Sequence, residues 1–101
     1  MATDTIVRTR PLVEVKEPPL YRVIYINDES TTMEFVIETL VLIFGYDHDE
    51  AEQTTLKIHK EGSAVVAVLP YEIAEQKGVE VTVCARAQNF PLQIKLEPET
   101  I

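Results

Sequence analysis

The chain has 101 residues, of which 46% are hydrophobic and 26% are charged, which suits one folded domain with a modest core rather than a disordered protein. The formal net charge of −8 argues against a nucleic-acid partner, because neutralising phosphates requires clustered Lys and Arg side chains. The single cysteine, Cys84, excludes an intramolecular disulfide and a multi-cysteine metal site.

The N-terminal segment, residues 1–20, has no helical or strand periodicity and contains three prolines. We expect a flexible arm here, followed by one folded domain over residues 21–101. The longest apolar run, Val36–Phe44, is interrupted by Glu38 and falls short of a membrane span, and no signal peptide is recognisable. We therefore expect a cytosolic protein with no membrane partner.

The first elements of the domain have clear start and stop signals. Tyr21–Ile26 is rich in β-branched and aromatic residues and ends at Asn27-Asp28, which predicts a strand followed by a turn. A helix is expected next, with Thr31 as its N-cap and Glu34 completing a capping box. Apolar residues then recur at helical spacing as far as Gly45, which favours a helix end.

A second helix and a second strand are expected to follow. Asp47 and Glu50 suit a helix N-terminus, and this helix should run to about Lys60. Ala64–Leu69 is a short continuous apolar run, which predicts a strand.

The next segment is ambiguous. Tyr71–Lys77 predicts a helix, but Gly78 resembles a helix end and Val79–Val83 alternates like a strand. The residue pattern alone favours a helix that stops at Gly78. A last strand is predicted by apolar residues that alternate with polar ones, namely Leu92, Ile94 and Leu96.

The expected order of elements is strand, helix, helix, strand, helix, strand. This order predicts an α+β fold in which three helices pack on one face of a small three-stranded antiparallel sheet.

No motif in the sequence indicates catalysis. Asp47-His48-Asp49-Glu50 resembles a set of metal ligands, but adjacent residues of a helix point in different directions and acidic residues also suit a helix start. A triad of Ser30, His59 and Asp28 can be imagined, yet nothing in the spacing selects it. There is no phosphate-binding glycine loop and no nucleophile elbow, so we expect no enzyme, metal or cofactor.

The stretch Tyr25–Val36 reads Tyr-Ile-Asn-Asp-Glu-Ser-Thr-Thr-Met-Glu-Phe-Val. It resembles the signature of the ClpS family, in which a strand runs into Asn-Asp-Asp and then Thr-Pro-Met-Glu-Phe-Val. The resemblance covers about residues 20–97 and includes further segments in register: Phe44-Gly45-Tyr46-Asp47, Ala51–His59, Glu61-Gly62, Glu72–Lys77, Ala85-Arg86 and Pro91-Leu92. In that family the segment matching Tyr71 to about Asn89 is one long helix, so the resemblance implies that the helix continues through Gly78.

The resemblance implies a non-enzymatic adaptor of the bacterial cytosol. A plastid location would require a transit peptide that is missing from this chain. ClpS-like proteins bind the free N-terminal residue of a substrate, when that residue is Leu, Phe, Tyr or Trp, and deliver the substrate to a Clp AAA+ ATPase of the ClpA or ClpC type. Carried over by position, the residues that hold the substrate α-amino group are Asn27, Asp28 and His59. The hydrophobic pocket would comprise Tyr25, Thr31, Met33, Val36, Thr55, Ile58 and Leu92. The ATPase contact would involve Glu72 and Lys77.

The sequence departs from the family pattern at a few positions. Thr55 stands where Met is common, so we expect the pocket to rank N-terminal residues differently. Milder departures are Glu29, Ser30, Thr32 and Phe90. Two rival hypotheses remain: a paralogue that regulates the Clp ATPase without delivering substrates, against which Asn27, Asp28 and His59 speak, and a hydrolase built on the histidines and acids.

Overall fold

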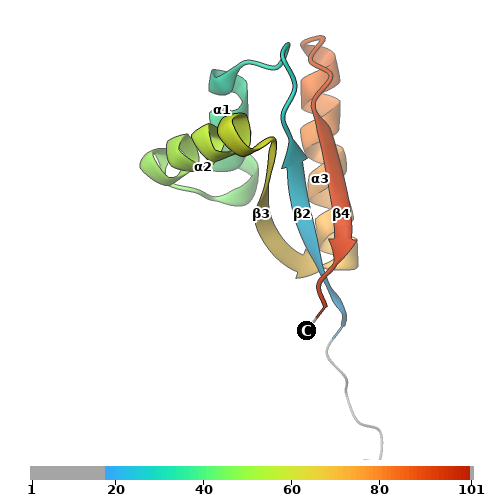
Figure 1. The fold of residues 1–101 in the computed structure, drawn as a ribbon. Coiled ribbons are helices and arrows are strands. Elements are labelled where there is room, and N and C mark those ends of the chain that lie inside the picture. Colours follow the sequence, from blue (N-terminus) through green and yellow to red (C-terminus); the bar gives the residue numbers. More distant parts are fainter. Residues whose placement is uncertain (1–17, 101) are drawn as a thin grey trace, which may run out of the picture.

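The computed structural model describes residues 18–100. The elements are β2 (Leu20–Ile26), α1 (Met33–Phe44), α2 (His48–Glu61), β3 (Ser63–Pro70), α3 (Tyr71–Ala87) and β4 (Gln93–Pro98) (Figure 1). This order confirms the predicted α+β fold. Most of the expected arm, residues 1–17, lies outside the described residues, and β2 begins one residue before the predicted start of the domain.

The sheet has β2 at its centre, antiparallel to β3 on one side and to β4 on the other (Figure 1). Tyr25 pairs with Ala64 of β3 and with Ile94 of β4, and the Tyr25 side chain is fully buried. On the opposite face Arg22 pairs with Glu97, and their side chains form an ion pair of 3.2 Å at partly exposed positions. The strands therefore alternate between a face toward the core and a face toward solvent.

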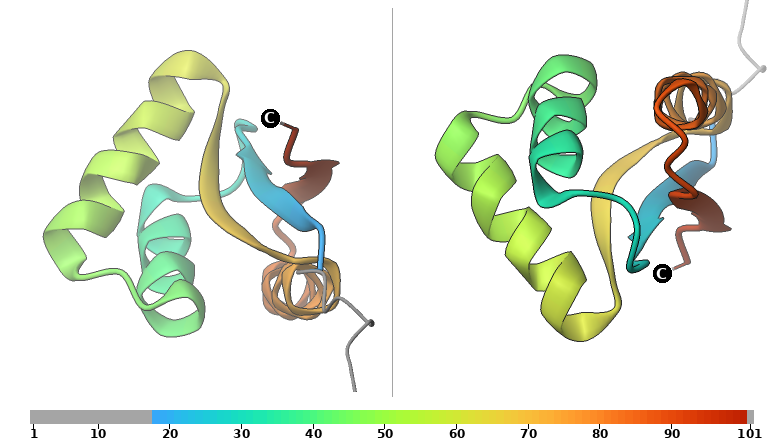
Figure 2. Two further views of the ribbon diagram at one scale, coloured as in Figure 1. Left: turned by 90° about the horizontal axis from the view of Figure 1, so that it is seen from below. Right: turned by 90° about the horizontal axis from the view of Figure 1, so that it is seen from above.

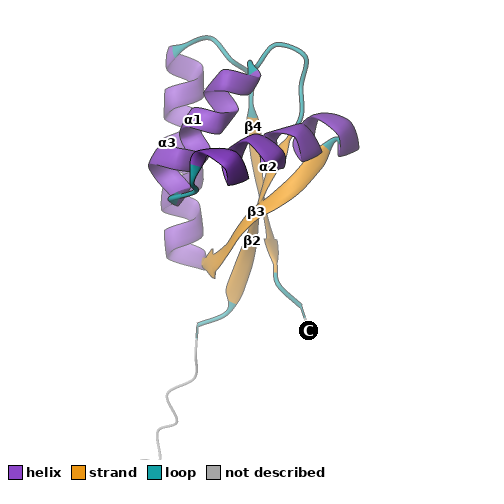
Figure 3. Ribbon diagram, turned by 90° about the vertical axis from the view of Figure 1, so that its left-hand side faces the viewer, coloured by secondary structure: helices purple, strands orange, loops and turns teal. Residues whose placement is uncertain are grey.

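The three helices are arranged around the inner face and the β3 side of this sheet. Viewed along the strands, α3 lies against the sheet while α1 and α2 lie beside β3 (Figure 2). The helix α2 crosses β3 and packs on α1, and α1 also contacts α3 (Figure 3). Within residues 18–100, no helix is both long enough and apolar enough to span a bilayer.

The helix α3 continues through Gly78, so the shorter helix followed by a strand over Val79–Val83 is wrong, and the long helix implied by the ClpS resemblance is confirmed. A Cβ atom at Gly78 would lie 3.5 Å from Ile94 Cγ2, an ordinary van der Waals distance, so this buried position of α3 faces β4 and has room for a methyl group. The buried residues of α3 recur at helical spacing and are small: Ala74, Gly78, Val81 and Ala85. This packing offsets the cost of about 1 kcal/mol for glycine in a helix.

The N-caps of α1 and α2 agree with the predicted ones only in part. The N-cap of α1 is Thr32 and not Thr31, because the Thr32 hydroxyl accepts a hydrogen bond of 3.2 Å from the amide of Phe35. Thr31 is instead bonded to Asp28, as described below. The predicted start of α2 is confirmed, since Asp47 caps it by accepting from the amide of Glu50 at 2.9 Å.

Candidate functional site

A cavity of about 270 Å³ lies where the end of β2, the start of α1 and the last turns of α2 meet. Exposed or half-exposed groups, among them Asn27, Asp28 and His59, stand at one part of the lining, and the buried side chains of Val36 and Ile58 form another. The full lining is Asn27, Asp28, Glu29, Thr31, Met33, Val36, Thr55, Ile58 and His59. A concave apolar site with a few convergent polar groups is the usual form of a ligand-binding site.

One backbone hydrogen bond joins the two chain segments that carry the polar lining residues. The amide of Asn27, just past β2, donates a hydrogen bond of 2.9 Å to the carbonyl of Gly62, just past α2. Gly62 adopts a positive φ of 92° and its own amide donates to the Ile58 carbonyl, which ends α2. His59 lies in that last helical turn. The chain therefore brings Asn27 and Asp28 to the same cavity as His59, although they are far apart in sequence.

Asp28 is held by the turn that leads into α1. Its Oδ1 atom accepts hydrogen bonds from the amides of Ser30 at 2.8 Å and Thr31 at 2.7 Å, and its Oδ2 atom accepts from the Thr31 hydroxyl at 2.8 Å. A carboxylate has about four acceptor positions, so this arrangement leaves room for a further donor. Asp28 is thus both a structural residue of the turn and an acceptor at the cavity.

The charge of Asp28 follows from the same contacts. Burial alone would raise the pKa of this carboxyl, but the hydrogen bonds from Thr31 and Ser30, together with the nearby charge of Arg86, lower the pKa below its ordinary value of 3.8. Asp28 is therefore an anion at neutral pH, which suits a cationic ligand.

Eight of the ten substrate-binding residues inferred from the resemblance line this cavity. The other two, Tyr25 and Leu92, are 0% and 1% exposed and belong to the hydrophobic core. The Tyr25 hydroxyl lies 2.8 Å from Thr39 Oγ1 in α1, and burial raises the pKa of the phenol. Neither residue is part of the cavity lining.

Two residues near the cavity were not assigned a site role from the sequence. Glu29 lines the cavity but was noted only as a departure from the family pattern. Arg86 Nη1 donates to the carbonyls of Phe90, at 2.8 Å, and Leu92, at 2.9 Å, and its charge favours the ionised form of Asp28. No spacing in the sequence links Arg86 to Asp28, because the two come together only through the tertiary fold.

The two residues expected to contact a Clp ATPase differ in their surroundings. Glu72 is exposed in the first turn of α3. Lys77 is half-buried, its Nζ atom donates to the Ile43 carbonyl at 2.8 Å, and it lies 5.8 Å from the centre of the Phe44 ring. Lys77 therefore fastens the end of α1 to α3.

The sequence favours a helix start over a metal site at Asp47-His48-Asp49-Glu50. The structure brings His48, Asp49 and Glu52 together, with one ligand atom of each within 4.8 Å of the others, so the expectation that adjacent residues point apart does not hold for His48 and Asp49. All three residues are exposed, and a surface group of this kind is not by itself a metal site.

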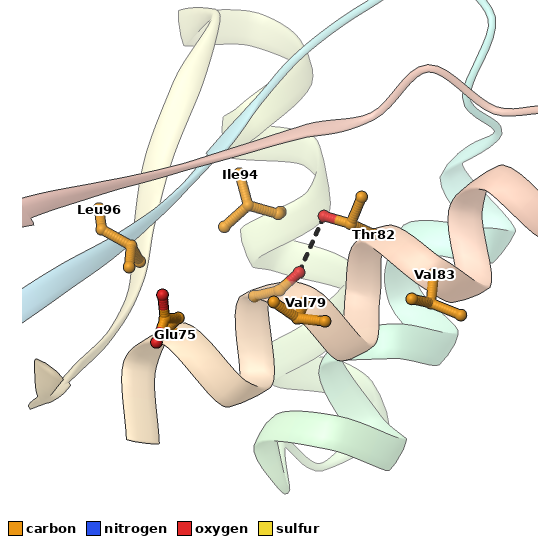
Figure 4. A pocket seen from close by; sticks show the side chains of 7 residues that line it. Glu75, Val79, Thr82, Val83, Ile94 and Leu96 are labelled. Carbon is orange, nitrogen blue, oxygen red and sulfur yellow. Dashed lines mark hydrogen bonds between the residues drawn. The ribbon is translucent and has the colours of Figure 1, made fainter. Parts of the chain in front are cut away.

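A second cavity, of about 260 Å³, lies between α3 and β4 (Figure 4). Its side chains are mostly apolar, and the Thr82 hydroxyl at its edge donates to the Gly78 carbonyl at 2.8 Å. None of the inferred site residues lines it, and it lacks the group of acceptors that distinguishes the first cavity.

Comparisons with known proteins show the family to which the chain belongs. Residues 16–95 match the model of the family described as ATP-dependent Clp protease adaptor protein ClpS. The Clp protease adapter proteins of Roseobacter denitrificans and Campylobacter jejuni subsp. doylei are each 44% identical to the chain, over 95% and 98% of its length and 85% and 99% of theirs. The solved structure of Agrobacterium tumefaciens ClpS2 bound to L-phenylalaninamide is similar, with a TM-score of 0.79 and 38% identity, and covers 82% of this chain and 100% of that one. The chain belongs to the ClpS family of Clp protease adaptors.

Proposed function

We propose that this adaptor binds proteins through a free N-terminal Leu, Phe, Tyr or Trp and delivers them to a Clp AAA+ ATPase. The observation that carries the proposal is the single cavity that combines the anionic Asp28 with the buried apolar side chains of Val36 and Ile58. A free bulky N-terminal residue offers the complementary pair, an ammonium group and a hydrophobic side chain.

The α-amino group is held by Asn27, Asp28 and His59. An amide oxygen, a carboxylate and an imidazole nitrogen each accept a hydrogen bond from an ammonium group. The charged bond to Asp28 contributes about 1.5–3 kcal/mol. An acetylated N-terminus has neither the charge nor the donors, so it would leave these acceptors unpaired and bind weakly.

The first side chain of the substrate occupies the apolar part of the cavity, against Met33, Val36 and Ile58. The volume of about 270 Å³ is slightly below the roughly 300–1,000 Å³ of pockets for drug-sized ligands and suits one side chain. The solved ClpS2 structure carries L-phenylalaninamide, a free amine with an aromatic side chain, which supports the same class of ligand for this chain.

Delivery requires a second surface that leaves the cavity open. Glu72, exposed at the start of α3, is proposed to contact the ATPase, and Lys77 to support this contact by holding α1 against α3. The ATPase partner is of the ClpA or ClpC type.

Degradation assays with a purified Clp ATPase and protease test the proposal. We expect this protein to accelerate degradation of a reporter that begins with Leu and not of the same reporter beginning with Gly. A protein that changes ATPase activity but leaves both reporters untouched would instead be the regulatory paralogue.

A further inference from the structure

The hydroxyl group of Thr55 is buried and has no hydrogen-bond partner among the described residues. Thr55 is 3% exposed and lines the 270 Å³ cavity from α2. Two other threonines in helices donate their hydroxyl hydrogen to a backbone carbonyl of the preceding turn. Thr39 donates to the carbonyl of Val36 and Thr82 to that of Gly78, both at 2.8 Å. Thr55 lacks such a bond. Because buried polar groups are nearly always paired, an unpaired hydroxyl beside a cavity points to a bound ligand as its partner.

The other groups around the cavity do not supply that partner. Val36 and Ile58 have no polar side-chain atom, and the Thr31 hydroxyl donates to Asp28. One other buried side-chain atom in the described part of the chain lacks a hydrogen bond, Arg22 Nε, but it lies 3.5 Å from a Glu99 carboxylate oxygen. Thr55 has no such ion pair, and it lies at the cavity.

Thr55 and His59 line the same cavity from successive turns of α2. The two residues are four apart in α2, so they lie on one face of the helix and about 6 Å apart along its axis. A substrate whose amino group binds at His59 would place the far end of its first side chain near Thr55.

We infer that Thr55 makes this adaptor select tyrosine over phenylalanine as the first residue of its substrate. The inference rests on the proposed function and names the preferred ligand of the same cavity. A tyrosine hydroxyl donates and accepts, so it pairs with the threonine hydroxyl whichever of the two is the donor. Threonine in a helix occupies two χ1 rotamers, so its hydroxyl can turn toward the ligand. Phenylalanine has nearly the same shape but leaves the buried hydroxyl unpaired.

The size of the expected preference is that of one uncharged hydrogen bond. Such a bond corresponds to roughly a three- to tenfold difference in affinity. The discrimination arises because tyrosine pairs a hydroxyl that is unpaired in the free protein, whereas phenylalanine leaves that hydroxyl unpaired.

Titrations with three peptides that differ only in the first residue, Tyr, Phe or Leu, test the inference. The wild type should bind the Tyr peptide about three- to tenfold more tightly than the Phe peptide. Thr55→Val, which keeps the side-chain shape, should bring the ratio of the two affinities to about one. Thr55→Ser, which keeps the hydroxyl, should retain the preference.

The matched control is Thr82→Val, the same change at a threonine outside this cavity, and it should leave the ratio as in the wild type. Thr55→Val should melt at the same temperature as the wild type or higher, because it removes an unpaired buried hydroxyl. If the valine variant does not fold, Thr55→Ala provides the same comparison.

The outcomes separate this inference from the function on which it rests. If the peptides bind but the Tyr-to-Phe ratio is near one in the wild type, or is unchanged in Thr55→Val, the role of Thr55 is wrong and the adaptor function stands. If none of the three peptides binds the wild type, both are wrong.

Discussion

The amide of Asn27 donates to the carbonyl oxygen of Gly62 across 2.9 Å, and this bond joins the end of the central strand to the end of the second helix. Asn27 and Asp28 follow the strand, whereas His59 occupies the last turn of the helix. The three acceptors of the cavity therefore share one lining because two chain segments end at the same point.

Gly62→Ala should weaken both the fold and peptide binding. The φ of 92° at Gly62 lies in the region that costs a residue with a Cβ about 1–2 kcal/mol, so the free energy of unfolding should fall by that amount. Relief of this strain would move the Asn27 contact, and the affinity for a Leu peptide should fall. Denaturant unfolding and peptide titration measure the two effects.

Gly45→Ala is the control for this prediction. Gly45 also has a positive φ, 76°, and an added Cβ meets no atom within 4 Å at either glycine, but Gly45 ends α1 and it is Gly62 whose carbonyl accepts from Asn27. It should lose similar stability and keep its peptide affinity. Equal affinities for the two variants would contradict the role given to Gly62.

Asp28→Asn should reduce the affinity for a free N-terminal Leu peptide by roughly five- to tenfold, because a charged hydrogen bond of about 1.5–3 kcal/mol becomes a neutral one of about 0.5–1.5 kcal/mol. The amide retains an oxygen for the amides of Ser30 and Thr31, so the turn should persist. Isothermal titration measures the loss. Glu38→Gln removes a charge at an exposed position of α1 and should have no effect; a loss of the same size there would contradict the prediction.

The lowered pKa of Asp28 predicts a pH dependence of stability. Because the folded state holds this carboxyl below its ordinary value of 3.8, its ionised form stabilises the fold at neutral pH. That contribution is complete above the ordinary pKa and is lost as the pH falls through the lowered folded value. The stability difference between wild type and Asp28→Asn, measured by urea unfolding, should be constant above about pH 5 and shrink in more acidic solution. A difference that persists unchanged at pH 2 would contradict this.

Glu72→Lys should weaken binding to the Clp ATPase and leave peptide affinity unchanged, since Glu72 is exposed on α3 and outside the cavity. The effect should diminish as salt is raised, because exposed charges are screened. Glu80→Lys introduces the same change at another exposed position of α3. If the two variants bind the ATPase alike in a pull-down, Glu72 is not part of the contact.

Local patterns predicted most of the elements, because caps and hydrophobic periodicity act between near neighbours. Local patterns failed where contacts between distant parts of the chain determine the structure. The alternation of Val79–Val83 favours a strand, yet only Val81 of its three valines is buried, and the segment continues the helical spacing of the buried residues of α3. Thr31 and Thr32 are both suitable caps, and the bond of Thr31 to Asp28 leaves Thr32 as the cap of α1.

The site was inferred by resemblance and not from residue chemistry. Asn27-Asp28 alone is ordinary turn chemistry, and nothing in the sequence pairs it with His59. The sequence also does not show how deeply each side chain is buried. For this reason the prediction groups the core residues Tyr25 and Leu92 with the residues that line the cavity. The unpaired Thr55 hydroxyl depends on the absence of an acceptor around it, which only coordinates reveal.

The most direct test is a calorimetric titration of one Phe-initiated peptide beside its N-acetylated twin. Both carry the same aromatic side chain, so they differ only in the ammonium group that Asn27, Asp28 and His59 are proposed to hold. We expect saturable binding of the free peptide and an affinity at least a hundredfold lower for the acetylated one, since both the charge and its donors are lost. Equal affinities would contradict the account, because recognition would then depend on the hydrophobic side chain alone.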